Sequence, residues 1–159
     1  MQTSARNQFQ GTVTRVERGA VNDEVEITLP GGPALVAVVT RRSAESLGLA
    51  VGVSAVALIK ASSVILATDT AGMRFSARNA LAGRIARVTP GAVNAEVVID
   101  VPGGVSVAAI VTQDSADRLG LAVGKPATAI FKASSVIVGV PARTPPGVSA
   151  SAGCPARRR

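Results

Sequence analysis

Apolar and polar residues alternate in short stretches along this 159-residue chain. Residues 9–17 ("FQGTVTRVE") and 23–29 ("DEVEITL") have a period of two, which is typical of half-buried strands. Residues 34–40, 54–60 and 62–68 are denser in Val, Ile and Leu, as expected of strands covered on both faces. The pattern therefore predicts five strands within the first 68 residues.

Two polar segments connect these strands. "PGG" at 30–32 combines the fixed φ of proline with glycines that can adopt positive φ, which predicts a hairpin. "TRRSAESLG" at 40–48 places a Thr cap before a short apolar-polar run and a glycine after it, which predicts a helix of one or two turns. Five strands with one short helix between the third and fourth predict a small closed barrel of the OB type.

The whole pattern occurs twice. Residues 4–66 align with residues 76–138 at an offset of 72 without a gap, and 36 of the 63 positions are identical. Such a repeat indicates an internal duplication. We therefore predict an all-β fold with one short helix per repeat, built as two tandem OB-like five-stranded β-barrels. The predicted bounds are 1–67 for the first domain, 68–75 for a linker, 76–140 for the second domain and 141–159 for a tail.

Composition places the chain among soluble globular proteins, with 47% hydrophobic and 17% charged residues. No apolar run approaches the roughly 18 to 20 residues of a membrane span, so we expect no transmembrane helix. The first residues lack the apolar core of a secretory signal, and Cys154 alone offers no disulfide framework. We expect a cytoplasmic protein.

Much of the positive charge lies in the tail. The net charge is +7, but residues 141–159 contain four Arg and no acidic residue, which leaves 13 basic and 10 acidic groups in residues 1–140. The Pro, Gly, Ser and Ala content of the tail does not build a core, so we expect it to be disordered. The folded part is only mildly basic.

Each repeat is near the lower size limit for independent stability. The chain has three Phe and no Trp or Tyr, so its core consists of small aliphatic groups. We expect the repeats to gain burial from contacts with each other or with other chains, and hence an oligomer.

The residues argue against an enzyme. The chain has no His, and its lone Cys lies outside the repeats, so the repeats offer no His-dependent acid-base chemistry, no Cys nucleophile and no zinc site of the usual ligands. Only the pairs Glu24/Glu96 and Glu45/Asp117 recur as acids at equivalent positions. No phosphate-binding glycine motif follows a strand. We therefore predict no catalysis, no catalytic cofactor and no direct protein ligands to a metal ion.

Hydrogen-bond donors, by contrast, recur in both copies. They are Ser4, Arg6, Asn7, Thr40, Ser43, Lys60, Ser62 and Ser63, and, 72 residues later, Ser76, Arg78, Asn79, Thr112, Ser115, Lys132, Ser134 and Ser135. Hydroxyls, amides and cations together suit a small tetrahedral dianion. Thr40 and Ser43 also stand at a predicted helix start, where backbone N–H groups favour negative charge.

Each of these segments also has a purely structural interpretation. "SARN" is equally typical of an ordinary strand start with a solvated Arg6, "KASSV" of a β-bulge with Lys60 on the surface, and Thr40 with Ser43 of a helix cap. Divergence favours the functional interpretation, because surface positions 41 and 42 differ between the copies whereas the donors do not.

The motifs "SARN", "GAVNAEV", "PGG", "DSADRLGLAVG" and "KASSVIV" resemble those of the molbindin family, also called Mop or TOBE domains, over residues 4–67 and 76–140. The chain is similar to a tandem di-Mop protein. The resemblance implies an OB-like barrel, a ring of six Mop units made by a homotrimer, and molybdate or tungstate bound between subunits.

The resemblance also implies the residues of the site. They are Ser4, Arg6, Lys60, Ala61 and Ser62 with Thr40 and Ser43, and Ser76, Arg78, Lys132, Ala133 and Ser134 with Thr112 and Ser115. We add Asn7 and Asn79 because they recur beside the arginines. Ala61 and Ala133 have only a backbone N–H to offer.

These observations predict an oxyanion-binding protein that stores, buffers or delivers molybdate or tungstate. The alternative is an OB-fold protein that binds single-stranded nucleic acid, but such proteins stack bases on aromatic side chains, and this chain has only Phe9, Phe75 and Phe131. A third alternative is a structural module that only oligomerises.

Overall fold

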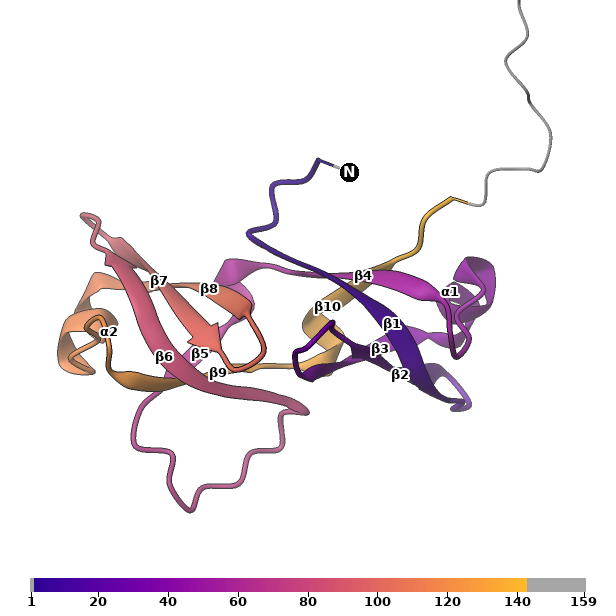
Figure 1. Cartoon of the computed structure of the whole chain (residues 1–159), viewed down its shortest axis with the longest axis horizontal. Coiled ribbons are helices and arrows are strands. Elements are labelled where there is room, and N and C mark those ends of the chain that lie inside the picture. Colours follow the sequence, from indigo (N-terminus) through magenta and orange to yellow (C-terminus); the bar gives the residue numbers. More distant parts are fainter. Residues whose placement is uncertain (1, 143–159) are drawn as a thin grey trace, which may run out of the picture.

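Two five-stranded barrels lie side by side along the long axis of the molecule (Figure 1). The computed structural model describes residues 2–142. The first repeat contains β1 (Asn7–Glu17), β2 (Asn22–Thr28), β3 (Ala34–Thr40), α1 (Arg41–Leu47), β4 (Ser54–Ile59), the 3₁₀ turn η1 (Ala61–Ser63) and β5 (Ile65–Ala67). The second contains β6 (Asn79–Thr89), β7 (Asn94–Val101), β8 (Val105–Thr112), α2 (Gln113–Arg118), β9 (Pro126–Phe131), η2 (Ala133–Ser135) and β10 (Val136–Gly139). The predicted fold class is confirmed.

The two repeats exchange their last strands. The strand orders are β10-β4-β1-β2-β3 and β5-β9-β6-β7-β8, so each barrel is completed by a strand of the other repeat. In β5, Ile65 pairs with Ile130, and in β10, Val136 pairs with Ile59. Figure 1 shows β5 beside β9 and β10 beside β4. The sequence repeats and the structural barrels therefore do not coincide, a feature that the predicted domain bounds did not contain.

The 3₁₀ turns carry out this exchange. After β4 the chain turns through η1, which packs against β8 of the second repeat, and η2 packs likewise against β3 of the first. Ser63 N–H donates to the carbonyl of Lys60 at 2.9 Å, and Ser135 donates to Lys132 at the same distance. The segment that also fitted a β-bulge is thus a 3₁₀ turn directed toward the other repeat.

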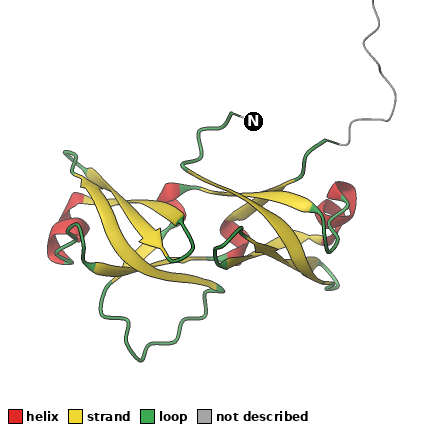
Figure 2. Cartoon of the chain, viewed as in Figure 1, coloured by secondary structure: helices red, strands yellow, loops and turns green. Residues whose placement is uncertain are grey.

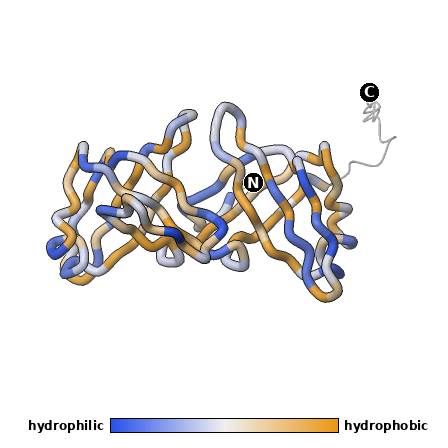
Figure 3. The backbone as a smooth tube through the Cα atoms, turned by 90° about the horizontal axis from the view of Figure 1, so that it is seen from below, coloured by the Kyte–Doolittle hydropathy of each residue, from blue (hydrophilic) through white to orange (hydrophobic). Residues whose placement is uncertain are grey.

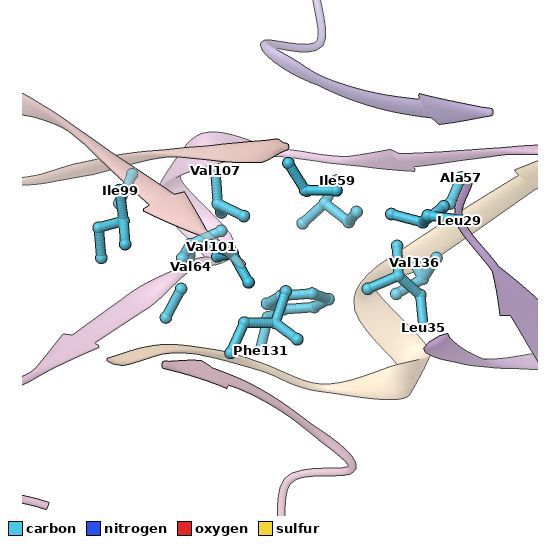
Figure 4. Packing of buried hydrophobic residues seen from close by; sticks show 14 of the residues in the cluster. Leu29, Leu35, Ala57, Ile59, Val64, Ile99, Val101, Val107, Phe131 and Val136 are labelled. Atoms are coloured by element: carbon cyan, nitrogen blue, oxygen red, sulfur yellow. The ribbon is translucent and has the colours of Figure 1, made fainter. Parts of the chain in front are cut away.

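One hydrophobic core extends through both barrels. Figure 4 shows Ile59, Val136 and Leu35 of one barrel near Phe131 and Val107 of the other. Along the strands, hydrophilic and hydrophobic positions alternate, as Figure 3 shows. Because the strand exchange joins the two barrels, the small aliphatic side chains of both repeats pack in one larger core. The repeats therefore gain burial from contact with each other, as expected from their small size.

The predicted turns and caps are present. Thr40 Oγ1 accepts from the Ser43 N–H at 3.1 Å at the start of α1, and Gly48 ends that helix with a φ of 64°. Both "PGG" segments form hairpins, and they meet between the barrels. At Gly103, with a φ of 96°, a Cβ would clash with the Gly31 carbonyl oxygen and with Gly32. Only glycine allows this close approach.

The expected coverage of the fifth strand on both faces is wrong for β5. Its Ile65 side chain is 64% exposed, because β5 is a three-residue edge strand that covers the barrel with one face only. Within the described residues, no helix is long and apolar enough to cross a membrane. Most of the predicted tail, residues 143–159, lies outside the described part of the chain.

Candidate functional site

A cavity of about 510 Å³ lies between the start of β1 and η1, and we call it the Lys60 cavity. It is lined by Thr3, Ser4, Ala5, Arg6, Leu58, Lys60, Ala61, Ser62, Ile110 and Ile137. Five of the predicted site residues meet here: Ser4, Arg6, Lys60, Ala61 and Ser62. Antiparallel pairing of Asn7 with Ile59 brings the two distant segments together, since each borders one of these paired residues.

The donors of this cavity are available for a ligand. Among the described residues, Lys60 forms no ion pair. Ser62 is exposed. Ser63 is the first residue whose N–H bonds within the turn, which leaves the N–H groups of Ala61 and Ser62 without an intrahelical partner. Ammonium, guanidinium, hydroxyl and backbone N–H groups therefore converge on one cavity.

A second cavity of about 510 Å³, the Lys132 cavity, lies at the equivalent place in the second barrel. It is lined by Ser62, Ser63, Ile65, Phe75, Ser76, Ala77, Ile130, Phe131, Lys132 and Ser135. Of the residues predicted for this repeat, Ser76, Lys132 and the recurring Ser135 line it, whereas Arg78, Ala133 and Ser134 do not, and Ser62 of the first repeat lines both cavities. The two cavities thus have related but unequal linings.

The recurring arginines and the recurring acids pair with each other across the repeats. Arg6 forms an ion pair with Glu96, and Arg78 Nη2 lies 2.7 Å from Glu24 Oε1. The sequence contained one signal for these pairs, since Glu24 and Glu96 are retained at equivalent positions. The two arginine side chains remain about half exposed, at 53% and 55%, and pairs with that exposure contribute little free energy. An incoming anion can therefore compete for them.

Asn7 and Asn79 occupy a different environment from the one predicted. Each is 1% exposed, and each side-chain amide bonds to the backbone of the other repeat. Asn7 Nδ2 donates to the Ala108 carbonyl at 2.8 Å, and Asn7 Oδ1 accepts from the Ala108 N–H at 2.7 Å. Asn79 makes the same two bonds with Val36, both at 2.8 Å. The two asparagines connect the repeats, and neither lines the Lys60 or the Lys132 cavity.

The hydroxyl pairs at the helix starts do not reach the cavities within one chain. Thr40 Oγ1 accepts from the Ser43 N–H at 3.1 Å and Thr112 Oγ1 from the Ser115 N–H at 3.2 Å, so the helix-capping interpretation is confirmed. Figure 2 shows α1 and α2 at the two ends of the molecule and the 3₁₀ turns near its middle.

Comparisons with known proteins agree with the repeat. The model of the TOBE domain matches residues 3–66 and 76–138. The molybdenum-pterin-binding protein MopA of Rhodobacter capsulatus is 53% identical over 141 residues, which are 89% of this chain and 53% of MopA. The molybdenum transport protein ModE of Herbaspirillum seropedicae is 47% identical over 140 residues, which are 88% of this chain and 52% of ModE. The chain spans about half the length of the curated relatives it matches.

A solved structure is similar over its whole length. The cytoplasmic molybdate-binding protein ModG, in a crystal form with molybdate bound, superposes with a TM-score of 0.85 at 51% identity and covers 89% of this chain and 100% of that chain. The fold, the sequence repeat and the family model all indicate two copies of one domain. The chain belongs to the TOBE domain family and contains two tandem copies of that domain.

Proposed function

We propose that this protein binds molybdate or tungstate in the cytoplasm, for the storage, homeostasis or delivery of the oxyanion, and that it carries out no catalysis. The observation that carries this proposal is the Lys60 cavity, where Arg6, Lys60, Ser4 and Ser62 meet although they come from segments more than 50 residues apart. The similarity to ModG, which has molybdate bound in its solved structure, supports the choice of ligand.

The chemistry of the cavity suits a tetrahedral dianion. Lys60 and Arg6 supply two positive charges, which match the charge of the ligand. Hydroxyl groups and the N–H groups of η1 can donate hydrogen bonds to its oxygens, because each of these groups carries a proton to donate. No carboxylate lines the cavity itself, but Glu96 pairs with its lining residue Arg6, so an anion competes with that carboxylate for the guanidinium group.

We also propose that three chains assemble into a ring of six domains, in which the helix start of one chain completes a cavity of the next. Exposed apolar side chains occur at equivalent positions of both repeats: Val21 and Val93, Val51 and Val123, Ile65 and Ile137. Ile137 and Ile65 border the two cavities. Arg41 N–H, at the start of α1, donates to the Val21 carbonyl at 2.9 Å. The exposed Val21 therefore lies close to the hydroxyls of Thr40 and Ser43. Its apolar side chain is suited to contact with a second chain.

The nucleic-acid alternative has less support. Of the three phenylalanines, Phe131 is buried and Phe9 is half-buried, and only Phe75 is exposed. A single exposed aromatic side chain does not provide a row of stacking surfaces for successive bases.

Titration calorimetry with molybdate, tungstate, sulfate and phosphate tests the proposal. We expect molybdate and tungstate to bind tightly and with more than one anion per chain. The double variant Lys60→Met, Lys132→Met removes the ammonium groups but keeps their apolar stems, so the affinity of each cavity should fall at least ~10-fold, as each site loses one charged hydrogen bond. Lys125→Met is the matched control, since Lys125 lines neither cavity.

Unchanged molybdate binding in the double lysine variant would contradict the site. Salt-sensitive binding of single-stranded DNA without any response to molybdate would support the alternative instead. For the assembly, light scattering should give the mass of three chains. The double variant Val21→Asp, Val93→Asp should dissociate the trimer and weaken molybdate binding together, because the ligand would bridge subunits.

A further inference from the structure

We propose that the two oxyanion sites of one chain are unequal, that the Lys60 cavity binds the anion more tightly than the Lys132 cavity, and that four exposed positions set the difference. These positions are Thr3 with its counterpart Phe75, and Glu17 with its counterpart Thr89. This inference rests on the proposed function, and it names residues that determine affinity at the same sites.

The first difference is the residue at the cavity surface. Thr3 lines the Lys60 cavity, and its Oγ1 accepts the Ala5 N–H at 3.2 Å, which leaves its hydroxyl proton free to donate to an anion. The equivalent residue of the Lys132 cavity is Phe75, which is 39% exposed and has no donor. At this one position, a hydroxyl donor to a charged ligand corresponds to a gain of about tenfold in affinity, although Ser63 and Ser135 line the Lys132 cavity and not the Lys60 cavity.

The second difference is the position of the arginine. Arg6 lines its cavity, whereas Arg78 does not line the Lys132 cavity. Arg78 pairs with Glu24, and no other described residue pairs with that carboxylate. Its charge is therefore neutralised by one partner of its own.

The third difference is the net charge around each arginine. Glu96 accepts from Arg6 and also from Arg87, whose Nη2 lies 2.8 Å from Glu96 Oε1, so these three groups have a net charge of +1. In the other repeat, the counterpart of Arg87 is Arg15, which pairs with Glu17 at 2.6 Å. Arg78, Glu24, Arg15 and Glu17 therefore have no net charge.

A single substitution accounts for this change in pairing. Glu17 provides Arg15 with a local partner, but the equivalent residue in the second repeat is Thr89, so Arg87 turns to Glu96 instead. Because Glu96 is shared between two guanidinium groups, Arg6 is the easier arginine for an anion to recruit. The position of the arginine and the charge around it favour the Lys60 cavity, and so does the Thr3/Phe75 pair taken alone.

Reciprocal substitutions at these four positions test the inference. All four side chains are exposed, so the variants should fold like the wild type. Thr3→Phe with Thr89→Glu gives the Lys60 cavity the features of the weaker site, and Phe75→Thr with Glu17→Thr gives the Lys132 cavity those of the tighter one. Titration of the full chain with sodium molybdate should resolve two classes of site at least ~10-fold apart in wild type. The first pair of substitutions should merge them into one weak class, and the second pair should merge them into one tight class.

Two further variants assign the classes. Lys60→Met should remove the tighter class, and Lys132→Met should remove the weaker class. One class of equal sites in wild type, or removal of the tighter class by Lys132→Met, would overturn the inequality while leaving molybdate binding intact. A wild-type chain that binds no molybdate would overturn the proposed function itself, and this inference with it.

Discussion

The two repeats stabilise the turn after their first strand with different residues, but they make the contacts between repeats with the same residues. In the first repeat, the buried Asp23 accepts from Arg18 Nη1 at 2.9 Å and from the Gly19 N–H at 3.1 Å. In the second repeat, the equivalents of Asp23 and Arg18 are Ala95 and Pro90. There, the N–H of Gly91 donates to Gln113 Oε1 at 3.3 Å instead.

The contacts between the repeats, by contrast, are retained. Asn7 and Asn79 make the same pair of bonds with the backbone of the opposite repeat, and Arg6 and Arg78 pair with equivalent glutamates. A local turn has several adequate solutions, because any nearby acceptor satisfies one N–H group. A contact between repeats has fewer, since two segments far apart in the chain must match.

The largest loss of stability should follow removal of the asparagine bonds. In the double variant Asn7→Ala, Asn79→Ala, four backbone groups of Ala108 and Val36 lose their partners, which should cost about 4–6 kcal/mol of unfolding free energy. Urea denaturation measures this change. The matched control is Asn22→Ala with Asn94→Ala, since both of these asparagines are exposed. A loss no greater than that of the control would show that the asparagines do not connect the repeats.

Transfer of the first repeat's acid into the second should also destabilise strongly. Ala95 is fully buried and Pro90 offers no positive charge, so Ala95→Asp places an uncompensated carboxylate in the core at a cost of about 3–5 kcal/mol. Addition of Pro90→Arg should recover part of this loss. If the unfolding free energy of Ala95→Asp alone stays within about 1 kcal/mol of wild type, a buried carboxylate at this position does not need an arginine partner such as Arg18.

The reverse transfer should cost less. Asp23→Ala removes the acceptor of the Gly19 N–H and should lower the unfolding free energy by about 1–3 kcal/mol. Arg41 is the counterpart of Gln113, so addition of Arg41→Gln should restore an acceptor and recover much of the loss. If the second substitution recovers nothing in the same denaturation assay, the two turns are not alternative solutions.

The smallest effect on stability should come from the glutamates. Glu24→Gln with Glu96→Gln removes two partly exposed ion pairs and should cost about 1 kcal/mol or less. The same variant should bind molybdate more tightly, because Arg6 and Arg78 no longer have a competing carboxylate. In this variant, the molybdate affinity measured by calorimetry should therefore rise while the unfolding free energy falls. Weaker molybdate binding would contradict competition between the glutamates and the anion.

Much of this architecture could be predicted from local sequence. The period-two strands, the Thr40 cap and the "PGG" hairpins depend on residues close together in the chain, and the 72-residue repeat is visible by aligning the sequence with itself; all are found in the structure. The meeting of "SARN" with "KASS" followed from the order of the strands in an OB barrel.

The strand exchange could not be predicted in this way. Residues 60–65 and 132–137 are identical, so each fifth strand begins with the same side chains and fits either barrel. Periodicity indicates which face of a strand is buried, but it does not identify the partner strand. For the same reason, the sequence places Asn7 beside the anion donors and does not indicate its partner Ala108, which lies 101 residues away.

Anomalous diffraction at the molybdenum edge, on crystals grown with molybdate, tests the central claim most directly. The account predicts one molybdenum peak in the Lys60 cavity and one in the Lys132 cavity, each with oxygens within hydrogen-bonding distance of the lysine ammonium group, and with the hydroxyls of a neighbouring chain's Thr and Ser closing the site. Molybdenum peaks only outside these two cavities would contradict it.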